Sequence, residues 1–139
     1  MQLSLTDEQQ AIVDALHDFA VNEVRPAARE CEAEGAPIER VAKGLFDMGV
    51  ASPLPEEFGG QGSFDAVTSV LISEEIAWGD PGVAFGVLQS GLAATIVDAL
   101  GTDEQRSELL PKLADGGAFA TAERDAGADI TNLETTHEG

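Results

Sequence analysis

The chain has 139 residues, of which 26 are acidic and only seven are lysine or arginine, for a formal net charge of -19. Such a charge repels the phosphates of nucleic acids and the headgroups of anionic membranes, which excludes both as expected partners. An apolar content of 43% with few aromatic residues and no tyrosine favours closely packed helices in one domain-sized unit.

The first predicted helix begins at a capping box. Thr6 is followed three residues later by Gln9, so that each side chain is placed to bond the other residue's backbone N–H. Apolar residues then recur at helical spacing. Pro26 lacks an N–H and should kink or divide this helix, and Gly35 should end it.

Two further helices surround a segment rich in proline and glycine. The second is expected from about Pro37 to Met48, with Gly49 as its C-terminal cap. Residues 52–62 contain two prolines and three glycines, and this composition keeps the segment out of a regular helix or strand. Ser63 is expected to cap the third helix. The residues that this helix should turn toward the core are Val67, Val70, Leu71, Ala77 and Trp78.

The fourth predicted helix is apolar almost all the way round. Asp80 before Pro81 is typical of an N-cap followed by proline at the first helical position. The helix should run from Pro81 to Leu100 and end at Gly101. Because its apolar residues occupy every side, it is expected in the middle of a bundle, covered by neighbours all round.

The last part of the chain changes character after a fifth helix. Thr102 and Gln105 repeat the capping box, and the helix should continue to about Ala114. Residues 118–122 are predicted to form a short strand, followed by a turn-rich loop over residues 124–129. A single strand or hairpin is marginal in water, so this segment is expected to need partner strands.

Other features bear on location and redox chemistry. The N-terminus carries Asp7 and Glu8 and has no basic start, which predicts no signal peptide and a cytoplasmic location. Cys31 is the only cysteine, so the chain can form neither an internal disulfide nor a cysteine metal cluster. The uncharged stretch from Gly82 to Val97 is judged too short for a membrane span.

Four segments, in this order, resemble the acyl-CoA dehydrogenase family. Each is weak alone, but their order and spacing along the whole chain are specific. The segments are Pro55-Glu-Glu-Phe-Gly-Gly-Gln-Gly62, Glu74-Glu-Ile-Ala77 with Asp80, Gly101-Thr-Asp-Glu-Gln-Arg106 with Leu110-Pro-Lys-Leu-Ala-Asp-Gly116, and Phe119-Ala-Thr-Ala-Glu-Arg-Asp-Ala-Gly-Ala-Asp129.

The resemblance implies an all-α bundle of the family's N-terminal type over residues 1–115. Residues 116–139 would be the start of the middle β domain, a short C-terminal β segment. Members use FAD to remove a proton and a hydride from adjacent carbons of an acyl-CoA thioester. The base is a glutamate of a C-terminal domain, so no catalytic residue is expected in this chain. The expected partners are the acyl-CoA substrate and the remaining domains or a complementary chain, in a homo-oligomer when complete.

The resemblance also implies site residues. The flavin edge would be lined by Phe119, Thr121, Ala122 and Glu123, through backbone N–H and C=O groups that stabilise charge on the ring. The acyl-chain pocket would include Leu88, Gln89, Leu92 and Ala128. No metal site is expected.

Three departures from the family pattern keep other functions open. Ala122 stands where a threonine is usual, Arg124 replaces a proline, and Ala128 replaces a serine. The alternatives are a non-catalytic helical interaction module, or a related acyl-CoA oxidase or flavin monooxygenase. The acidic composition further suggests adaptation to high salt, with an ordinary acidic protein as the other interpretation.

Overall fold

The computed structural model describes residues 4–51, 54–60, 62, 64–113, 117, 120, 122–127 and 129–136, and these residues form a helical bundle. Its β structure, within the described residues, is an isolated bridge between Glu123 and Gly127. The all-α prediction is therefore confirmed. The elements are α1 (Asp7–Phe19), the π-helical turn η1 (Ala20–Val24), α2 (Arg25–Glu34), α3 (Glu39–Asp47), the 3-10 turn η2 (Glu56–Phe58), α4 (Ala66–Gly79), α5 (Pro81–Leu100), α6 (Asp103–Leu113) and the 3-10 turn η3 (Ile130–Asn132).

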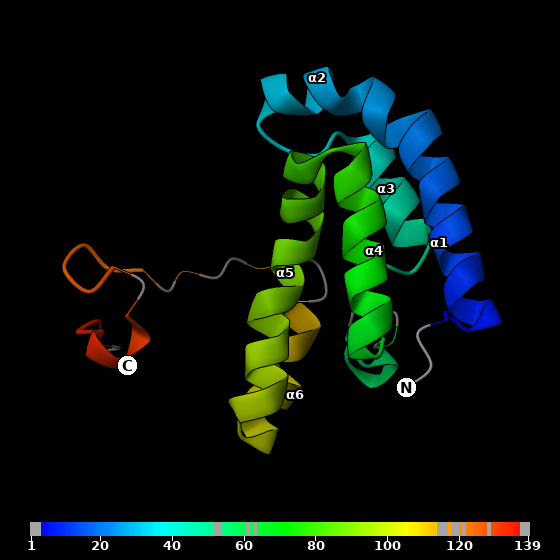
Figure 1. The fold of residues 1–139 in the computed structure, drawn as a ribbon. Coiled ribbons are helices and arrows are strands. Elements are labelled where there is room, and N and C mark those ends of the chain that lie inside the picture. The colour runs from blue at the N-terminus through cyan, green and yellow to red at the C-terminus, as the bar shows by residue number, and fades with distance from the viewer. Residues whose placement is uncertain are drawn as a thin grey trace.

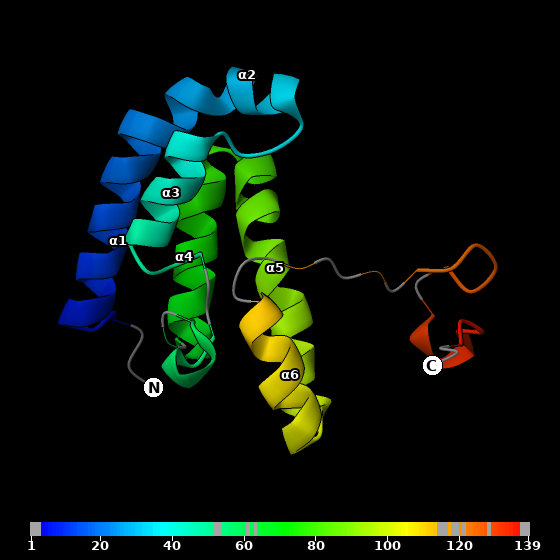
Figure 2. The ribbon, with the colours of Figure 1, turned by 180° about the vertical axis from the view of Figure 1, so that it is seen from behind.

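Three long helices lie side by side in the bundle. The helix α4 packs between α1 and α5, and α6 runs back along the second half of α5 (Figure 1). The helix α2 crosses one end of the bundle, and α3 lies on the side seen from behind (Figure 2). The described residues from 122 onward lie apart from the helices in both views.

The capping box and the division of the first helix are both confirmed. The N–H of Gln9 donates to Thr6 Oγ1 over 3.2 Å, and the N–H of Thr6 donates to Gln9 Oε1 over 3.1 Å. Pro26 lies at the start of α2, directly after the π turn, so the chain changes direction there without breaking its helical path. Gly35 ends α2 with a φ of 69°, a left-handed conformation that glycine adopts without strain.

Two groups of buried side chains hold the bundle together. The larger joins α1, α2, α3, α4 and the first half of α5, and the smaller joins the loop before η2 to α5 and α6. Burial of such side chains is the main stabilising term, at roughly 1.5–3 kcal/mol for each large aliphatic residue. The larger group includes Leu16, Val24, Val41, Leu45, Ile72, Ile76, Val83 and Val87, and the smaller comprises Leu54, Ala94 and Leu110.

The buried face of α4 differs from the prediction. Val67, Val70 and Trp78, expected in the core, are 55%, 64% and 46% exposed. The helix instead buries Thr68, Ile72 and Ile76, while Leu71 and Ala77 are half-buried. Apolar residues occupy both faces of α4, so their spacing does not select one face, and the packing of α1 and α5 decides it.

The N-cap of α4 is Asp65, two residues after the predicted Ser63, which itself lies outside the described residues. Asp65 Oδ1 accepts the N–H of Val67 over 2.8 Å and that of Thr68 over 3.1 Å. The Thr68 hydroxyl also donates to Asp65 Oδ2 over 2.6 Å. Together with the helix start, these donors favour the ionised carboxylate.

This cap predicts an acid-sensitive contribution to stability. The hydroxyl and then the N–H of Thr68 hold the pKa of Asp65 below its ordinary value of 3.8. A lowered pKa means that the stabilisation is present above the ordinary value and is lost as pH falls through the lowered one. We expect Asp65→Asn to shrink the loss of stability measured by urea unfolding between about pH 4 and pH 2.5. An unchanged acid-side slope in Asp65→Asn would contradict this cap.

The helix α5 has the bounds that the sequence predicts. The Asp80 carboxylate caps it by accepting the N–H of Val83 over 2.9 Å. The whole helix spans 20 residues with a mean hydropathy of 1.6 in its most apolar window, so by length and composition alone it could cross a membrane. The uncharged stretch of residues 82–97 is the central part of this longer helix. Core helices meet the same criterion, and α5 packs against α4 and α6.

Candidate functional site

One side of α5 is open, contrary to the prediction that neighbours cover this helix all round. Its exposed stripe, called here the α5 face, is formed by Phe85, Gln89, Leu92, Ile96 and Leu100. Phe85 is 69% exposed, Leu92 50% and Leu100 82%. Their spacing of three or four residues places them along one line of the helix. An apolar stripe of this size is unusual on a free surface and indicates a contact with something else.

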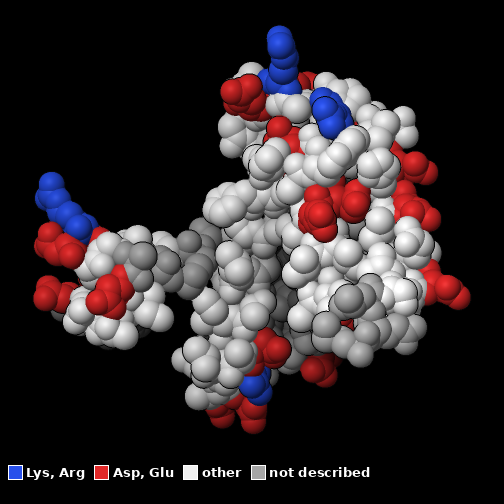
Figure 3. Space-filling view, in the orientation of Figure 1, with Lys and Arg blue, Asp and Glu red and all other residues white. Residues whose placement is uncertain are grey.

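The α5 face also differs in charge from its surroundings. Asp98 is the only charged residue of α5. Acidic side chains are prominent over α1 and at the ends of the bundle, whereas the surface over α5 is largely free of charge (Figure 3). A neutral apolar strip on so acidic a protein is a surface that another apolar group can approach with little electrostatic cost.

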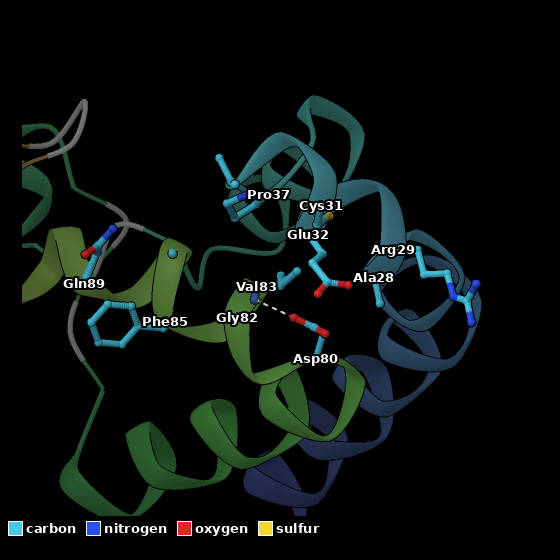
Figure 4. Close-up of a pocket in the computed structure, with 13 residues that line it drawn as sticks. Ala28, Arg29, Cys31, Glu32, Pro37, Asp80, Gly82, Val83, Phe85 and Gln89 are labelled. Atoms are coloured by element: carbon cyan, nitrogen blue, oxygen red, sulfur yellow. Dashed lines mark hydrogen bonds between the residues drawn. The ribbon is translucent and has the colours of Figure 1, made fainter.

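A groove runs beside the first half of this face, between α2 and α5. Its volume is about 660 Å³. Phe85 and Gln89 border it on α5, and Glu32 and Asp80 lie toward its other end (Figure 4). Two of its lining residues are in close contact, because a Cβ on Gly86 would lie only 2.8 Å from Pro37 Cδ. The full lining comprises Ala28, Arg29, Cys31, Glu32, Gly35, Ala36, Pro37, Asp80, Gly82, Val83, Phe85, Gly86 and Gln89.

The residues expected at an acyl chain fall on two sides of α5. Gln89 and Leu92 both lie on the α5 face, and Gln89 also borders the groove. Leu88 is half-buried and packs against the larger core cluster. Ala128 lies outside the described residues. The structure thus brings two of the four expected residues, Gln89 and Leu92, together at an open surface. Phe85 and Ile96 lie beside them there and were not predicted.

The expected flavin edge is only partly described. Phe119 and Thr121 lie outside the described residues, and Ala122 is exposed. Glu123 is engaged by its own loop: its carboxylate accepts the N–H of Glu134 over 2.9 Å and that of Thr135 over 2.7 Å, and also bonds the Thr135 hydroxyl. These bonds hold the pKa of Glu123 below its ordinary value, and the bond from the Glu134 N–H has the largest effect. The backbone N–H and C=O of Glu123 are also paired with Gly127, so this residue's expected flavin-edge groups are engaged within its own loop.

A surface cluster at the junction of α1, α2 and α4 was not predicted. His17 Nδ1 lies 2.9 Å from Glu75 Oε2, and the His17 ring contacts Trp78 with centroids 4.5 Å apart. Arg25 Cζ lies 4.5 Å above the same tryptophan ring. Trp78, predicted as a core anchor, therefore holds helices together from outside the core. Its partners are far away in the sequence, so no local signal could have found this cluster.

Comparison with known proteins covers most of the chain. Residues 6–117 match the family model described as acyl-CoA dehydrogenase, N-terminal domain. The short-chain specific acyl-CoA dehydrogenase of Clostridium acetobutylicum is 35% identical over 142 residues, which cover 97% of this chain and 37% of the relative. Butyryl-CoA dehydrogenase from Megasphaera elsdenii has a similar structure, with a TM-score of 0.76, 30% identity and coverage of 97% of this chain and 37% of the other.

A further solved structure, a glutaryl-CoA dehydrogenase from Mycobacterium smegmatis in complex with FADH2, gives a TM-score of 0.76 at 25% identity, covering 94% of this chain and 35% of the other. The chain thus spans little more than a third of the length of the relatives it matches.

Proposed function

The chain belongs to the acyl-CoA dehydrogenase family, whose N-terminal domain it contains, and from this premise we propose that it forms one wall of the acyl-binding site of a flavoprotein that dehydrogenates acyl-CoA thioesters. The observation that carries the proposal is the open α5 face. An apolar, uncharged stripe is suited to an alkyl chain and to apolar side chains of the remaining domains, because both gain from leaving water.

In this role the chain supplies binding and exclusion of water. Phe85, Leu92 and Ile96 provide apolar contact area along α5, and Gln89 provides an amide that can bond a polar group among them. FAD, which would accept the hydride, and the base that would take the α-proton belong to the rest of such a protein.

The first test uses the 139-residue chain alone. We expect it to lose FAD on desalting and to leave added FAD unbleached by butyryl-CoA, because the chain spans only 37% of the length of the Clostridium acetobutylicum relative. Absorbance between 300 and 500 nm after gel filtration measures both. A yellow sample that bleaches with butyryl-CoA would show that the chain is a complete enzyme.

The second test asks whether the domain works when completed. Its sequence would replace the matching N-terminal part of the Clostridium acetobutylicum relative. We expect this chimera to retain FAD and to bleach with butyryl-CoA. Leu92→Lys in the chimera should reduce kcat/KM at least about ten-fold, since a desolvated ammonium at an apolar contact costs on the order of 1.4 kcal/mol or more. Val70→Lys, on the exposed side of α4, is the matched control and should leave kcat/KM nearly unchanged.

A non-catalytic interaction module is the alternative of a different class, and the same open face supports it. A chimera that folds but loses FAD, combined with a partner protein that the isolated chain retains and Leu92→Lys releases, would favour the module. Relatives acting as oxidases or monooxygenases would differ in their reaction with oxygen, which the chimera assay can record as peroxide formation.

We further propose that the chain is adapted to high salt. Its described Lys and Arg ion pairs are exposed and involve few of the carboxylates, and the whole chain has 26 acidic residues for only seven lysines and arginines. Salt at 1 M shortens the screening length to about 3 Å and weakens this self-repulsion. We expect the urea midpoint, followed by circular dichroism, to rise from about 10 mM to about 1 M NaCl. A midpoint independent of salt, with full helicity in dilute buffer, would contradict the proposal.

A further inference from the structure

The helix α2 is attached to the bundle differently from the other long helices. Of its ten residues it buries Ala27 and Cys31, both small, whereas α1, α3 and α4 bury leucine, valine or isoleucine. Small buried side chains contribute little apolar area, so α2 gains less from packing than its neighbours do. Segments with little buried apolar surface are those that open locally in native proteins.

Each end of α2 also has a feature that permits a change of direction. Its N-terminal end follows the π turn η1, a helical irregularity with a widened hydrogen-bond pattern. Its C-terminal end is Gly35, whose φ of 69° is free of a side-chain clash, since nothing lies within 4 Å of an added Cβ. Val24 of η1 is fully buried, and a Cβ on Gly79 would lie 2.8 Å from Val24 Cγ1, so η1 stays anchored to α4 and the change of direction takes place where α2 leaves it.

Contacts on the surface hold α2 in place. Arg25 lies over the exposed ring of Trp78 on α4. The His17 ring of α1 contacts the same tryptophan, and His17 in turn is bonded to Glu75 of α4. On α3, Arg40 Nη1 lies 3.2 Å from Glu30 Oε2 of α2, and Arg40 Nε lies 3.7 Å from Glu23 Oε2 of η1. These pairs are exposed, and exposed ion pairs and cation–π contacts are individually weak.

We infer that α2 is a latched flap over the groove beside α5, with Arg25 on Trp78 as the latch and the π turn and Gly35 as its pivots. The inner side of the flap carries Cys31, which is 5% exposed and lines the groove. When the flap opens, the groove widens and Val83, which lines the groove and is 1% exposed in this structure, becomes accessible. When it closes, Val83 is sheltered from water, while Phe85 at the start of the α5 face stays exposed.

Cys31 is the only cysteine and reports directly on this motion. Iodoacetamide labelling of the full chain, followed by mass spectrometry at increasing urea, gives the rate at which the thiol becomes accessible. We expect labelling at low urea to be faster than global unfolding by circular dichroism allows, with a weaker dependence on urea. Labelling that follows global unfolding in both rate and urea dependence would overturn the flap.

The latch has its own matched variants. Arg25→Ala should raise the labelling rate at low urea about two- to five-fold, as expected for loss of an exposed cation–π contact. Arg25→Lys retains a cation, so its labelling rate should stay close to that of the unsubstituted chain. Arg29→Ala removes the same residue type from the same helix, at an exposed side chain that borders the groove (Figure 4), and should leave the rate unchanged. Equal rates in Arg25→Ala and Arg29→Ala would overturn the assignment of the latch.

Discussion

Replacing Ile76 by alanine is expected to lower the free energy of unfolding by about 3 kcal/mol. Ile76 is 1% exposed and belongs to the larger core cluster that joins α4 to α1, α3 and α5. Removing three side-chain carbons there loses their transfer energy and leaves a cavity that the surrounding helices fill only partly. Urea unfolding followed by circular dichroism measures the loss, with an unchanged slope if the native bundle persists.

Val70→Ala on the same helix is the control. Val70 is 64% exposed, so this substitution should change the free energy of unfolding by less than about 0.5 kcal/mol. The prediction made from spacing alone would give the opposite order, because it places Val70 inside. A large loss for Val70→Ala and a small one for Ile76→Ala would mean that α4 is rotated relative to this structure.

The starts of α1, α5 and α6 could be predicted because their signals are local. The bonds that open α1 and α6 join residues three apart, as in Thr6 with Gln9 and Thr102 with Gln105. The start of α5 depends on Asp80 and the N–H of Val83, again three residues on. Such bonds form whatever the rest of the chain does, so the sequence next to a helix end suffices to predict it.

The direction in which a helix faces depends on contacts that are distant in the sequence. Both α4 and α5 carry apolar residues around much of their circumference, so no single stripe stands out. The core face of α4 is decided by α1 and α5, and the open face of α5 by the absence of a covering element among the described residues. Composition correctly predicted that α5 is apolar and wrongly predicted that neighbours cover it on every side. The sequence of a helix gives its apolarity but does not say which other elements pack against it.

The candidate site shows the same division. Gln89 and Leu92 are three residues apart, so their sharing of one helix side follows from helical geometry. Leu88 turns toward the core through packing against other helices. Glu123 is engaged by Glu134 and Thr135, more than ten residues further on, and this loop contact has no sequence signature.

Gly60→Ala is expected to destabilise the chain by about 3 kcal/mol. A Cβ at Gly60 would lie 2.1 Å from the carbonyl oxygen of Leu54 and 2.3 Å from its Cβ, far inside contact distance and partly against backbone. Leu54 is 2% exposed and packs with Ala94 and Leu110, so pushing it away disturbs the contact that joins this loop to α5 and α6. Close packing against Leu54 thus explains the glycine at position 60 in the segment that resembles the family's loop. Urea unfolding of Gly60→Ala measures the loss in the free energy of unfolding.

Gly62→Ala separates this steric effect from backbone strain. Gly62 has a φ of 96°, which an alanine adopts only with strain, but nothing lies within 4 Å of an added Cβ. We expect a smaller loss there, about 1 kcal/mol, because only the backbone preference is violated. If both substitutions cost about 1 kcal/mol, the loop yields to the new methyl group and Leu54 is not fixed by its neighbours. If Gly60→Ala costs about three times as much as Gly62→Ala, the loop and the second half of α5 form one packed unit. The C-terminal end of the α5 face, at Ile96 and Leu100, would then belong to a rigid part of the bundle.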